Sequence, residues 1–485
     1  MERRTVYRRT TRYIVCGMAV LAGLGWARFS GDVTGWLPVL LGLFVLVSFK
    51  KARVVSVYAA ILFGFSLGWW RGGQFMSEVT YLTTLNNDKV TIVGKALTDG
   101  VYDKQASLAF DMGSLELESP EQRALVGKIG VSGFGERAVY RGDVVRVTGK
   151  YYPSRGGRVA YLSFAKLEVI GRSQSVIYKT TREFSAGMQN ALPEPQASFG
   201  LGLLFGQRST LPENTTVILA AVGLTHVVAV SGYNLTILVS AARKLLSRRS
   251  KYQALVGASV LIILFLLVTG ASPSIVRASI ISFLSLGAWY YGRNIRPMLL
   301  IILTASLTAL WNPLYIWSDI GWYLSFLAFF GVLVVAPVAK QRFFGDKKVG
   351  ILSELILEST AAQLMTLPLI LYIFNDSSFV AIFANLLVVP LVPLAMLFSF
   401  IAGMAGMLAP AFAGWFAWPA RYLLTYLLDV ATLVSRIPYM QFSVSIGLYS
   451  LIFMYAIIVS TTTLWWKKSK ISSKITDVNE PNYQT

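Results

Sequence analysis

Residues 252–270 read YQALVGASVLIILFLLVTG, a stretch without a charged side chain. A helix of roughly 20 apolar residues crosses a bilayer core of about 30 Å, so this stretch predicts a membrane-spanning helix. Comparable stretches recur along the whole chain, and about twelve of them are long enough to cross. The sequence therefore predicts a polytopic α-helical membrane protein rather than an anchored soluble one.

The composition of the 485-residue chain supports this fold class. Hydrophobic residues make up 55% and charged residues 14%, whereas a soluble domain carries roughly 25% charged residues. The chain has one histidine and one cysteine, Cys16, which argues against a disulfide framework and against a transition-metal site built by the protein. No metal and no other cofactor is expected.

The expected spans fall into two groups. Three lie within residues 1–75, at 13–29, 36–49 and 54–70. Two shorter apolar pieces, 197–206 and 379–389, are expected to be re-entrant, because Pro390 and Pro393 interrupt the second and irregular backbone needs shielding at membrane depth. The second group occupies residues 196–466, with spans at 216–242, 252–270, 274–291, 298–311, 319–338, 351–374, 393–408, 411–436 and 445–466.

Positive charge sets the expected orientation. The formal net charge is +20, and arginines and lysines crowd the N-terminus, the loop after residue 242 and the loop at 340–348. Because cytoplasmic loops carry the excess of Lys and Arg, both termini are expected in the cytoplasm, and residues 467–485 predict a disordered cytoplasmic tail. A polyanionic substrate would also suit this charge, although topology alone explains most of it.

Residues 85–172 differ from the rest of the chain. Short alternating runs, separated by turn signals such as Asp99-Gly100 and Gly156-Gly157, predict about five strands. A small closed barrel of the OB type fits that number, and three preceding spans would place it outside the membrane. Residues 173–195 predict an amphipathic helix at the interface, with Phe184 and Met188 on its apolar side.

Few polar residues fall inside the expected spans, and three share the run GLTHVVAVSGYN at 223–234. On a regular helix, Ser231 and Asn234 are neighbours and His226 lies within a quadrant of Asn234, so the three predict one polar stripe. His226 and Ser231 would be about 140° apart, which argues against a hydrolytic dyad. Simple hydrogen bonding to neighbouring helices remains the alternative.

Two further residues are costly in a membrane. Arg277 needs a carboxylate, carbonyl oxygens or water at that depth, and a structural salt bridge to Asp319 is one solution. Asn385 adds polarity beside the second expected re-entrant piece.

Basic and aromatic residues are interleaved in the second half of the expected barrel. Proteins that bind single strands combine a basic groove with aromatic side chains on which bases stack. An ordinary charged surface is the alternative. The candidate DNA contacts are Arg137, Arg141, Arg146, Lys150, Tyr151, Tyr152, Arg155, Arg158 and Tyr161.

Several motifs, in order, resemble the ComEC family of competence channel proteins. The run at 223–234 is similar to the family's Gly-Leu-x-His-x-x-x-x-Ser-Gly-x-Asn signature. Residues 203–208 resemble an apolar piece that ends in Gly-Asp/Gln-Arg, and 273–278 a Ser-x-x-Arg-Ala element. Residues 319–326 resemble Asp-x-Gly-Phe-x-Leu-Ser, with Trp322 in place of Phe, and 385–393 an Asn-x-x-x-x-Pro segment.

The resemblance implies a channel that passes one DNA strand across the bacterial cytoplasmic membrane, with an outer OB-like domain and a competence domain at 196–466. It also implies single-stranded DNA and the bilayer as partners, together with a separate DNA receptor and a cytoplasmic ATPase or helicase. The expected path-lining residues are His226, Ser231, Gly232, Asn234, Arg277, Asp319 and Asn385.

Many members of the family end in a metallo-β-lactamase-like nuclease domain, whose zinc site needs a cluster of histidines. With a single histidine, this chain is expected to be no enzyme and to depend on a separate nuclease. Three alternatives stay open: a secondary transporter of a small solute, an intramembrane hydrolase that uses Ser231 and His226, and a truncated or diverged member without a role in transformation. The sequence does not predict the oligomeric state.

Overall fold

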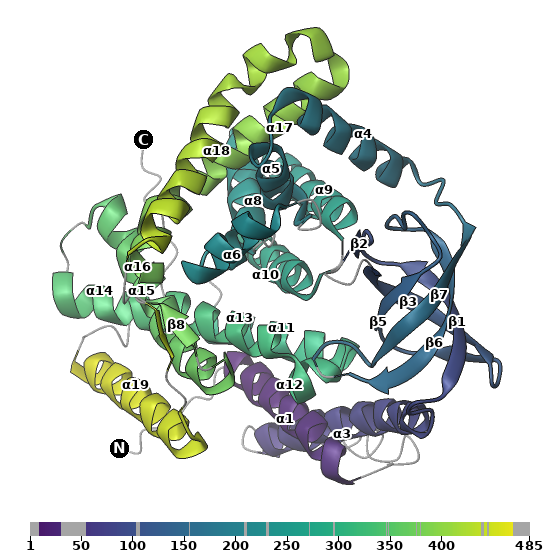
Figure 1. The fold of residues 1–485 in the computed structure, drawn as a ribbon. Helices are drawn as coiled ribbons and strands as arrows, with labels where there is room; N and C mark the ends of the chain where they lie inside the picture. The colour runs from purple at the N-terminus through teal and green to yellow at the C-terminus, as the bar shows by residue number, and fades with distance from the viewer. Residues whose placement is uncertain are drawn as a thin grey trace. The chain divides into compact units, whose positions relative to one another are not determined.

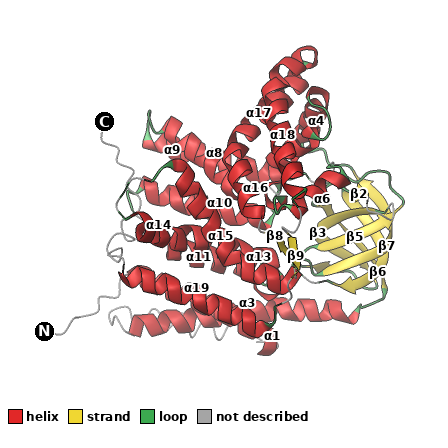
Figure 2. Cartoon of the chain, turned by 60° about the vertical axis from the view of Figure 1, so that its left-hand side comes forward, coloured by secondary structure: helices red, strands yellow, loops and turns green. Residues whose placement is uncertain are grey.

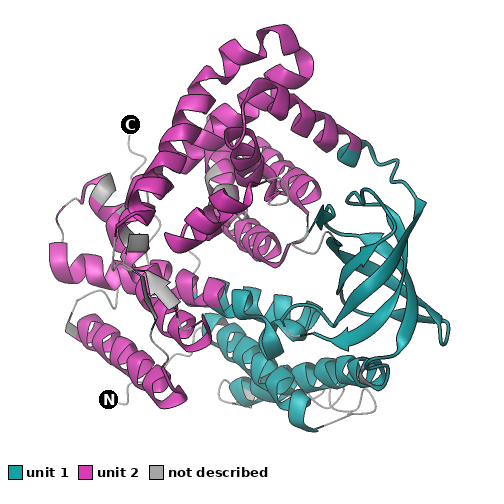
Figure 3. Ribbon diagram, in the orientation of Figure 1, with its two compact units in different colours: residues 1–178, 298–323 teal, residues 179–297, 324–485 magenta. Residues whose placement is uncertain are grey.

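The structure is a computed structural model that describes residues 9–30 and 55–468, apart from gaps at 103–106, 155, 208–210, 229–231, 271, 294–295, 346, 348, 375, 379, 438–440 and 444–445. It divides into two compact units (Figure 3). Unit 1 comprises residues 1–178 and 298–323, and unit 2 comprises 179–297 and 324–485.

Unit 1 begins with two long helices that pack closely. They are α1 (Arg9–Ser30) and α3 (Val55–Thr84). A Cβ atom on Gly68 would lie 2.2 Å from the carbonyl oxygen of Val20, and one on Gly23 would lie 2.1 Å from that of Phe65. Glycines therefore allow the two backbones to touch, as small residues do between membrane helices. The expected span at 36–49 lies outside the described residues, and α3 continues well past the expected end at residue 70.

The strands of unit 1 form one sheet (Figure 2). Its pairing order is β1-β6-β7-β5-β3, and β3 pairs with β1 again, so the ladder returns to its first strand. The β5–β7 pair is parallel and the other pairs are antiparallel. The bounds are β1 (Lys89–Ala96), β2 (Val101–Tyr102), β3 (Leu108–Ser119), β4 (Arg123–Leu125), β5 (Ile129–Phe134), β6 (Val144–Pro153) and β7 (Ala160–Gly171).

Alternation along these strands builds one apolar core. Val90, Ile92, Val145, Val147 and Leu162 are each at most 1% exposed, and their strand neighbours point outward. The helices α11 (Pro297–Trp311) and α12 (Leu314–Ser318) complete unit 1, and Leu314 joins the same core.

Unit 2 is mostly helical (Figure 1). A short pair of strands, β8 (Asp376–Ser378) and β9 (Gln441–Ser443), joins the segments after α15 and α18. Its helices are α4 (Val176–Ala191, which begins in unit 1), α5 (Gln196–Phe205), α6 (Glu213–Ala221), α7 (Thr225–Val228), α8 (Gly232–Leu246), α9 (Lys251–Thr269), α10 (Pro273–Tyr290), α13 (Ile320–Phe330, which also begins in unit 1), α14 (Ala336–Phe344), α15 (Ile351–Phe374), α16 (Val380–Val388), α17 (Val392–Leu408), α18 (Ala413–Ser435) and α19 (Leu448–Lys468).

Six of the described helices are long and apolar enough to cross a membrane, which fits a multi-pass membrane protein. They are Thr10–Ser30, Lys251–Thr269, Ile320–Phe344, Ile356–Phe374, Phe383–Leu408 and Leu448–Lys467. The expected number of twelve crossings stays a prediction. The tail at 469–485 lies outside the described residues.

One expected span is wrong. Residues 216–242 form no continuous helix, because α6 ends at Ala221 and Gly223 takes a left-handed backbone with φ +72°. Such a conformation suits glycine and ends an α-helix. The segment continues as the short α7 and, after the gap at 229–231, as α8.

The two pieces expected to be re-entrant behave differently. The first forms the short α5, whose residues are largely buried. The second is less interrupted than predicted, because a 3₁₀ turn at Val389–Leu391 links α16 to α17 and the helical path runs on to Leu408. Re-entry of either piece stays a prediction.

The helix after the sheet packs on protein through its apolar side. A Cβ atom on Gly187 of α4 would lie 2.8 Å from the carbonyl oxygen of Gly403 in α17, and Phe184 covers Gly403. The predicted topology puts α4 at the outer interface but the end of the 393–408 span at the inner face. The contact at Gly403 brings α4, expected at the outer interface, against the part of the 393–408 span expected near the inner face. These two expectations therefore conflict.

Candidate functional site

Outward residues of β6 and β7 form the main candidate surface of the sheet. Strand β6 alternates strictly, so Lys150 and Tyr152 point outward while Tyr151 between them is 1% exposed. The prediction that Tyr151 contacts DNA is therefore wrong: its ring fills the core, and burial raises the pKa of its hydroxyl. The sequence showed two adjacent tyrosines, and only the strand register decides which of them is accessible.

Tyr152 and Tyr161 are cross-strand partners on β6 and β7. Tyr161 lies across Gly130 of β5, where an added Cβ atom would meet its Cδ2 at 2.6 Å and the Cδ of Arg158 at 3.3 Å. Gly130 thus leaves the space that these two side chains occupy. The sequence interpretation did not single out Gly130, because the parallel β5–β7 pairing joins residues that are distant in the chain.

Charges surround the two tyrosines. Arg158 Nε lies 2.7 Å from Asp111 Oδ1, and Lys128 Nζ lies 3.8 Å from Asp111 Oδ2, so one carboxylate faces two cations. Lys150 is exposed. Lys128, Lys150, Tyr152, Arg158 and Tyr161 are called the aromatic–basic patch below.

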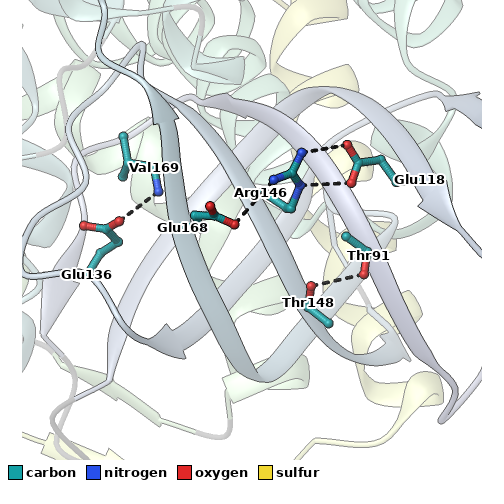
Figure 4. Close-up of polar contacts among 7 residues, drawn as sticks. All are labelled: Thr91, Glu118, Glu136, Arg146, Thr148, Glu168 and Val169. Carbon is teal, nitrogen blue, oxygen red and sulfur yellow. Dashed lines mark hydrogen bonds and ion pairs between the residues drawn. The ribbon is translucent and has the colours of Figure 1, made fainter.

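Other predicted DNA contacts lie elsewhere or are neutralised. Arg146 is held by Glu118 at 3.0 Å and by Glu168 at 3.4 Å (Figure 4), so its charge is compensated. Arg141 precedes β6 and lies over the ring of Tyr178 at 5.3 Å. Arg137, in the β5–β6 loop, is exposed, and Arg155 lies outside the described residues. The residues predicted to form one DNA-binding surface therefore lie in separate groups in the structure.

The β6–β7 loop touches the segment that begins α13. Ser318 donates a hydrogen bond to the carbonyl oxygen of Gly156 at 2.7 Å, and a Cβ atom on Gly157 would lie 3.0 Å from Asp319 Oδ2. Asp319 also accepts a hydrogen bond from the backbone N–H of Trp322 at 3.1 Å, as an N-cap does. Asp319 therefore caps α13 beside the loop that carries Arg158, a contact that the sequence interpretation missed.

Arg277 is 5% exposed and has polar and aromatic neighbours in unit 2. Its Nε donates to Ser325 Oγ at 3.1 Å, and its guanidinium lies 5.8 Å from the ring centre of Phe326. Ser325 belongs to the 319–326 motif and Arg277 to the 273–278 element. The two motifs therefore contact each other through this serine. The predicted ion pair between Arg277 and Asp319 stays a prediction.

His226 lies in α7, and its side chain is exposed while Val227 and Val228 are buried. Its Nδ1 is 2.9 Å from the carbonyl oxygen of Gly223. Ser231 lies outside the described residues, so the 140° expected between His226 and Ser231 stays a prediction.

The remaining expected path residues have different surroundings. A Cβ atom on Gly232 would lie 2.9 Å from the Cβ of Ala278, so α8 and α10 approach closely there. Asn385 Oδ1 is buried and has no hydrogen-bond partner within the described part of the chain. Ser231 and the side chain of Asn234 lie outside the described residues.

Comparison with known proteins gives the family. Residues 203–469, more than half of the chain, match the Competence protein family. This chain belongs to that family. It is also 27% identical over 256 residues to ComE operon protein 3 of Bacillus subtilis (strain 168).

The alignment with ComE operon protein 3 covers 49% of this chain and 31% of the relative, so this chain matches about a third of that protein's length. No solved structure matches the chain. The family match begins at residue 203 and includes His226, Arg277, Asp319 and Asn385, whereas the sheet of unit 1 precedes it. The membrane motifs therefore rest on family membership, and the aromatic–basic patch rests on its geometry alone.

Proposed function

We propose that this chain conducts single-stranded DNA across the bacterial cytoplasmic membrane during natural transformation. The observation that carries the proposal is the Competence protein match over residues 203–469, which contains the broken 213–246 segment with its exposed His226. A polar side chain at membrane depth faces a water-filled cavity or another polar group far more often than lipid.

We infer that the sheet of unit 1 is an OB-type barrel on the outer side of the membrane. In order along the chain, its five long strands pair 1-2-3-5-4-1 with a parallel 3–5 pair. OB-folds bind oligonucleotides on the face of strands 2 and 3 and with the loop between strands 4 and 5. Here that loop is the β6–β7 loop, which carries Arg155 and Arg158.

The aromatic–basic patch suits a single strand. Each base that stacks on an aromatic side chain contributes about 1–3 kcal/mol, and every base offers a ring face. Tyr152 and Tyr161 supply two rings, while Lys150, Lys128 and Arg158 supply cations for phosphates. The strand would then pass to a path lined by residues near His226, Gly232 and Asn385.

The proposal places both termini in the cytoplasm and requires other proteins. A separate receptor would deliver the DNA, a separate nuclease would degrade the second strand, and a cytoplasmic ATPase or helicase would supply the driving force.

One observation favours a second candidate, a secondary transporter of a small solute. Helices broken near the membrane midplane form the substrate sites of such transporters, and the 213–246 segment is broken at Gly223. Removing the aromatic–basic patch should reduce transport by a DNA channel, whereas transport by a carrier of a small solute should not depend on the patch.

The test uses a strain that lacks the gene, complemented with the native chain or with a Tyr152→Leu/Tyr161→Leu chain. We expect the native chain to restore cytosolic entry of labelled DNA and the double variant to restore much less at equal membrane abundance. Full restoration by the double variant would remove the patch from the account, and no effect of the native chain would reject the channel.

A further inference from the structure

The helix α18 has one regularly buried side. Seven of its buried positions step by four and three residues along the helix, as in a coiled-coil seam, and all of these except Ala413 join the core of unit 2. These positions are Ala413, Ala417, Ala420, Leu424, Leu427, Ala431 and Val434. Such a seam fixes which side of α18 faces the neighbouring helices, and therefore also which side does not.

The opposite side of α18 is exposed and carries charge. Trp418 and Tyr422 are 61% and 62% exposed, Tyr426 is 41% exposed, and Arg421 and Asp429 are exposed as well. This exposed side, which we call the α18 face, comprises residues 418, 421, 422, 426, 429 and 436, and the exposed Trp415 and Leu433 lie on the same side. None of its residues was singled out in the sequence, because the charges stand far apart in an otherwise apolar stretch.

The span expected at 411–436 contains α18, but α18 is not among the six described helices that are apolar enough to cross a membrane. A purely lipid-facing helix therefore does not explain the α18 face. Trp and Tyr are common at the membrane interface, but Asp429 is six residues from the end of α18, about 9 Å along the axis. A short aspartate side chain does not reach the interface from there as lysine or arginine would. Within the described residues Asp429 forms no ion pair. Ionisable residues in membrane segments face water-filled cavities, pair with one another or mark substrate pathways.

A second polar contact borders this face. Gln196 Nε2 of α5 donates to Thr425 Oγ1 at 2.9 Å, and the Oε1 of Gln196 is buried without a hydrogen-bond partner among the described residues. Thr425 lies between Tyr422 and Asp429 on α18. The edge of the α18 face is therefore polar, and α5 leads directly into the matched family region at residue 203.

We propose that the α18 face lines the aqueous path and forms the track along which the single strand moves. Tyr422 and Tyr426 are one helical turn apart, about 6 Å along the axis, and offer rings to bases. Arg421 and the exposed Arg436 contact phosphates, and Asp429 accepts hydrogen bonds from the amino groups of bases. This inference rests on the proposed channel function.

The experiment is cysteine accessibility in membranes that contain the full chain. Cys16→Ser removes the one native cysteine, and Thr425→Cys, Tyr426→Cys and Asp429→Cys are made separately in that background. Phe453→Cys, five residues inside the apolar α19 and 66% exposed, is the matched control. The probe is a charged methanethiosulfonate, with and without an oligo-dT strand, and membrane abundance is measured for every variant.

We expect the α18 cysteines to react roughly tenfold or more faster than the control, since the thiolate forms in water and not in lipid. Oligo-dT should slow the α18 reactions and leave the control unchanged. Rates equal to the control at all three positions would show a lipid-facing α18 and overturn the proposal. Fast reactions that oligo-dT does not slow would show an aqueous face that is no DNA track, and would overturn it as well.

DNA uptake by the Cys16→Ser parent separates this inference from the proposed function. If the parent restores uptake while the α18 cysteines stay unreactive, the channel proposal stands and the α18 track alone is rejected.

Discussion

Removing the two stacking rings of the aromatic–basic patch should weaken binding of single-stranded DNA without unfolding the sheet. The change is Tyr152→Leu together with Tyr161→Leu. Tyr152 points outward on β6, and Tyr161 lies over Gly130 on the same outer surface. Leucine keeps an apolar side chain at both positions but has no ring face for a base.

The magnitude follows from the number of rings. Even at the lower limit of about 1 kcal/mol per stacked base, two rings contribute about 2 kcal/mol, which corresponds to a Kd roughly 30-fold higher. The assay is fluorescence anisotropy of a labelled oligo-dT with the full chain purified in detergent. Each single variant should account for about half of the change in free energy, because each ring would stack on its own base.

A matched control is Tyr102→Leu, which removes another exposed tyrosine, on β2, whose hydroxyl donates to the carbonyl oxygen of Arg137. For Tyr102→Leu we expect the Kd for oligo-dT to change by less than about threefold, because Tyr102 lies outside the aromatic–basic patch. If the double variant binds as tightly as the native chain, or if Tyr102→Leu weakens binding equally, the stacking argument fails.

Three further predictions concern charge, the core and the helix cap. Lys150→Gln should lower the slope of log Kd against log salt by about 0.7, the value for one phosphate contact on a single strand; an unchanged slope in an anisotropy salt titration would remove Lys150 from the patch. Tyr151→Ala should destabilise the sheet by about 3–5 kcal/mol through the cavity it leaves, measured by denaturant unfolding, while the remaining folded protein binds DNA normally. Asp319→Ala should cost about 1 kcal/mol through loss of the α13 cap, and Asp319→Asn should lose less; equal thermal unfolding of both variants and the native chain would contradict the cap.

The sequence predicted the kinds of element well and their continuity poorly. The strands of 85–172 were predictable because apolar and polar residues alternate, and the membrane character because long runs lack charge. The break at Gly223 was not predicted from the sequence, because a glycine inside an apolar run is compatible with a continuous helix. Its φ of +72° belongs to a helix-ending motif in which the N–H groups of Gly223 and Leu224 donate to the carbonyl oxygens of Ala220 and Leu219.

The site was predicted in part, for a similar reason. Composition located basic and aromatic residues in the right strands, but the inward position of Tyr151 depends on the register of β6 against β1 and β7. The pairing of Arg146 with Glu118 joins residues on strands that are not adjacent in the chain. Asp319 was expected in the membrane path, whereas its cap on α13 and its contact with Gly157 depend on long-range packing.

Entry of DNA into the cytosol tests the central claim most directly. Cells that lack the gene are given DNA labelled on one strand, and surface-bound and nuclease-protected cytosolic label are counted separately, with and without the native chain supplied in trans. The account predicts that the deletion retains surface label and loses cytosolic label, and that the native chain restores entry. Normal cytosolic label in the deletion strain would contradict it.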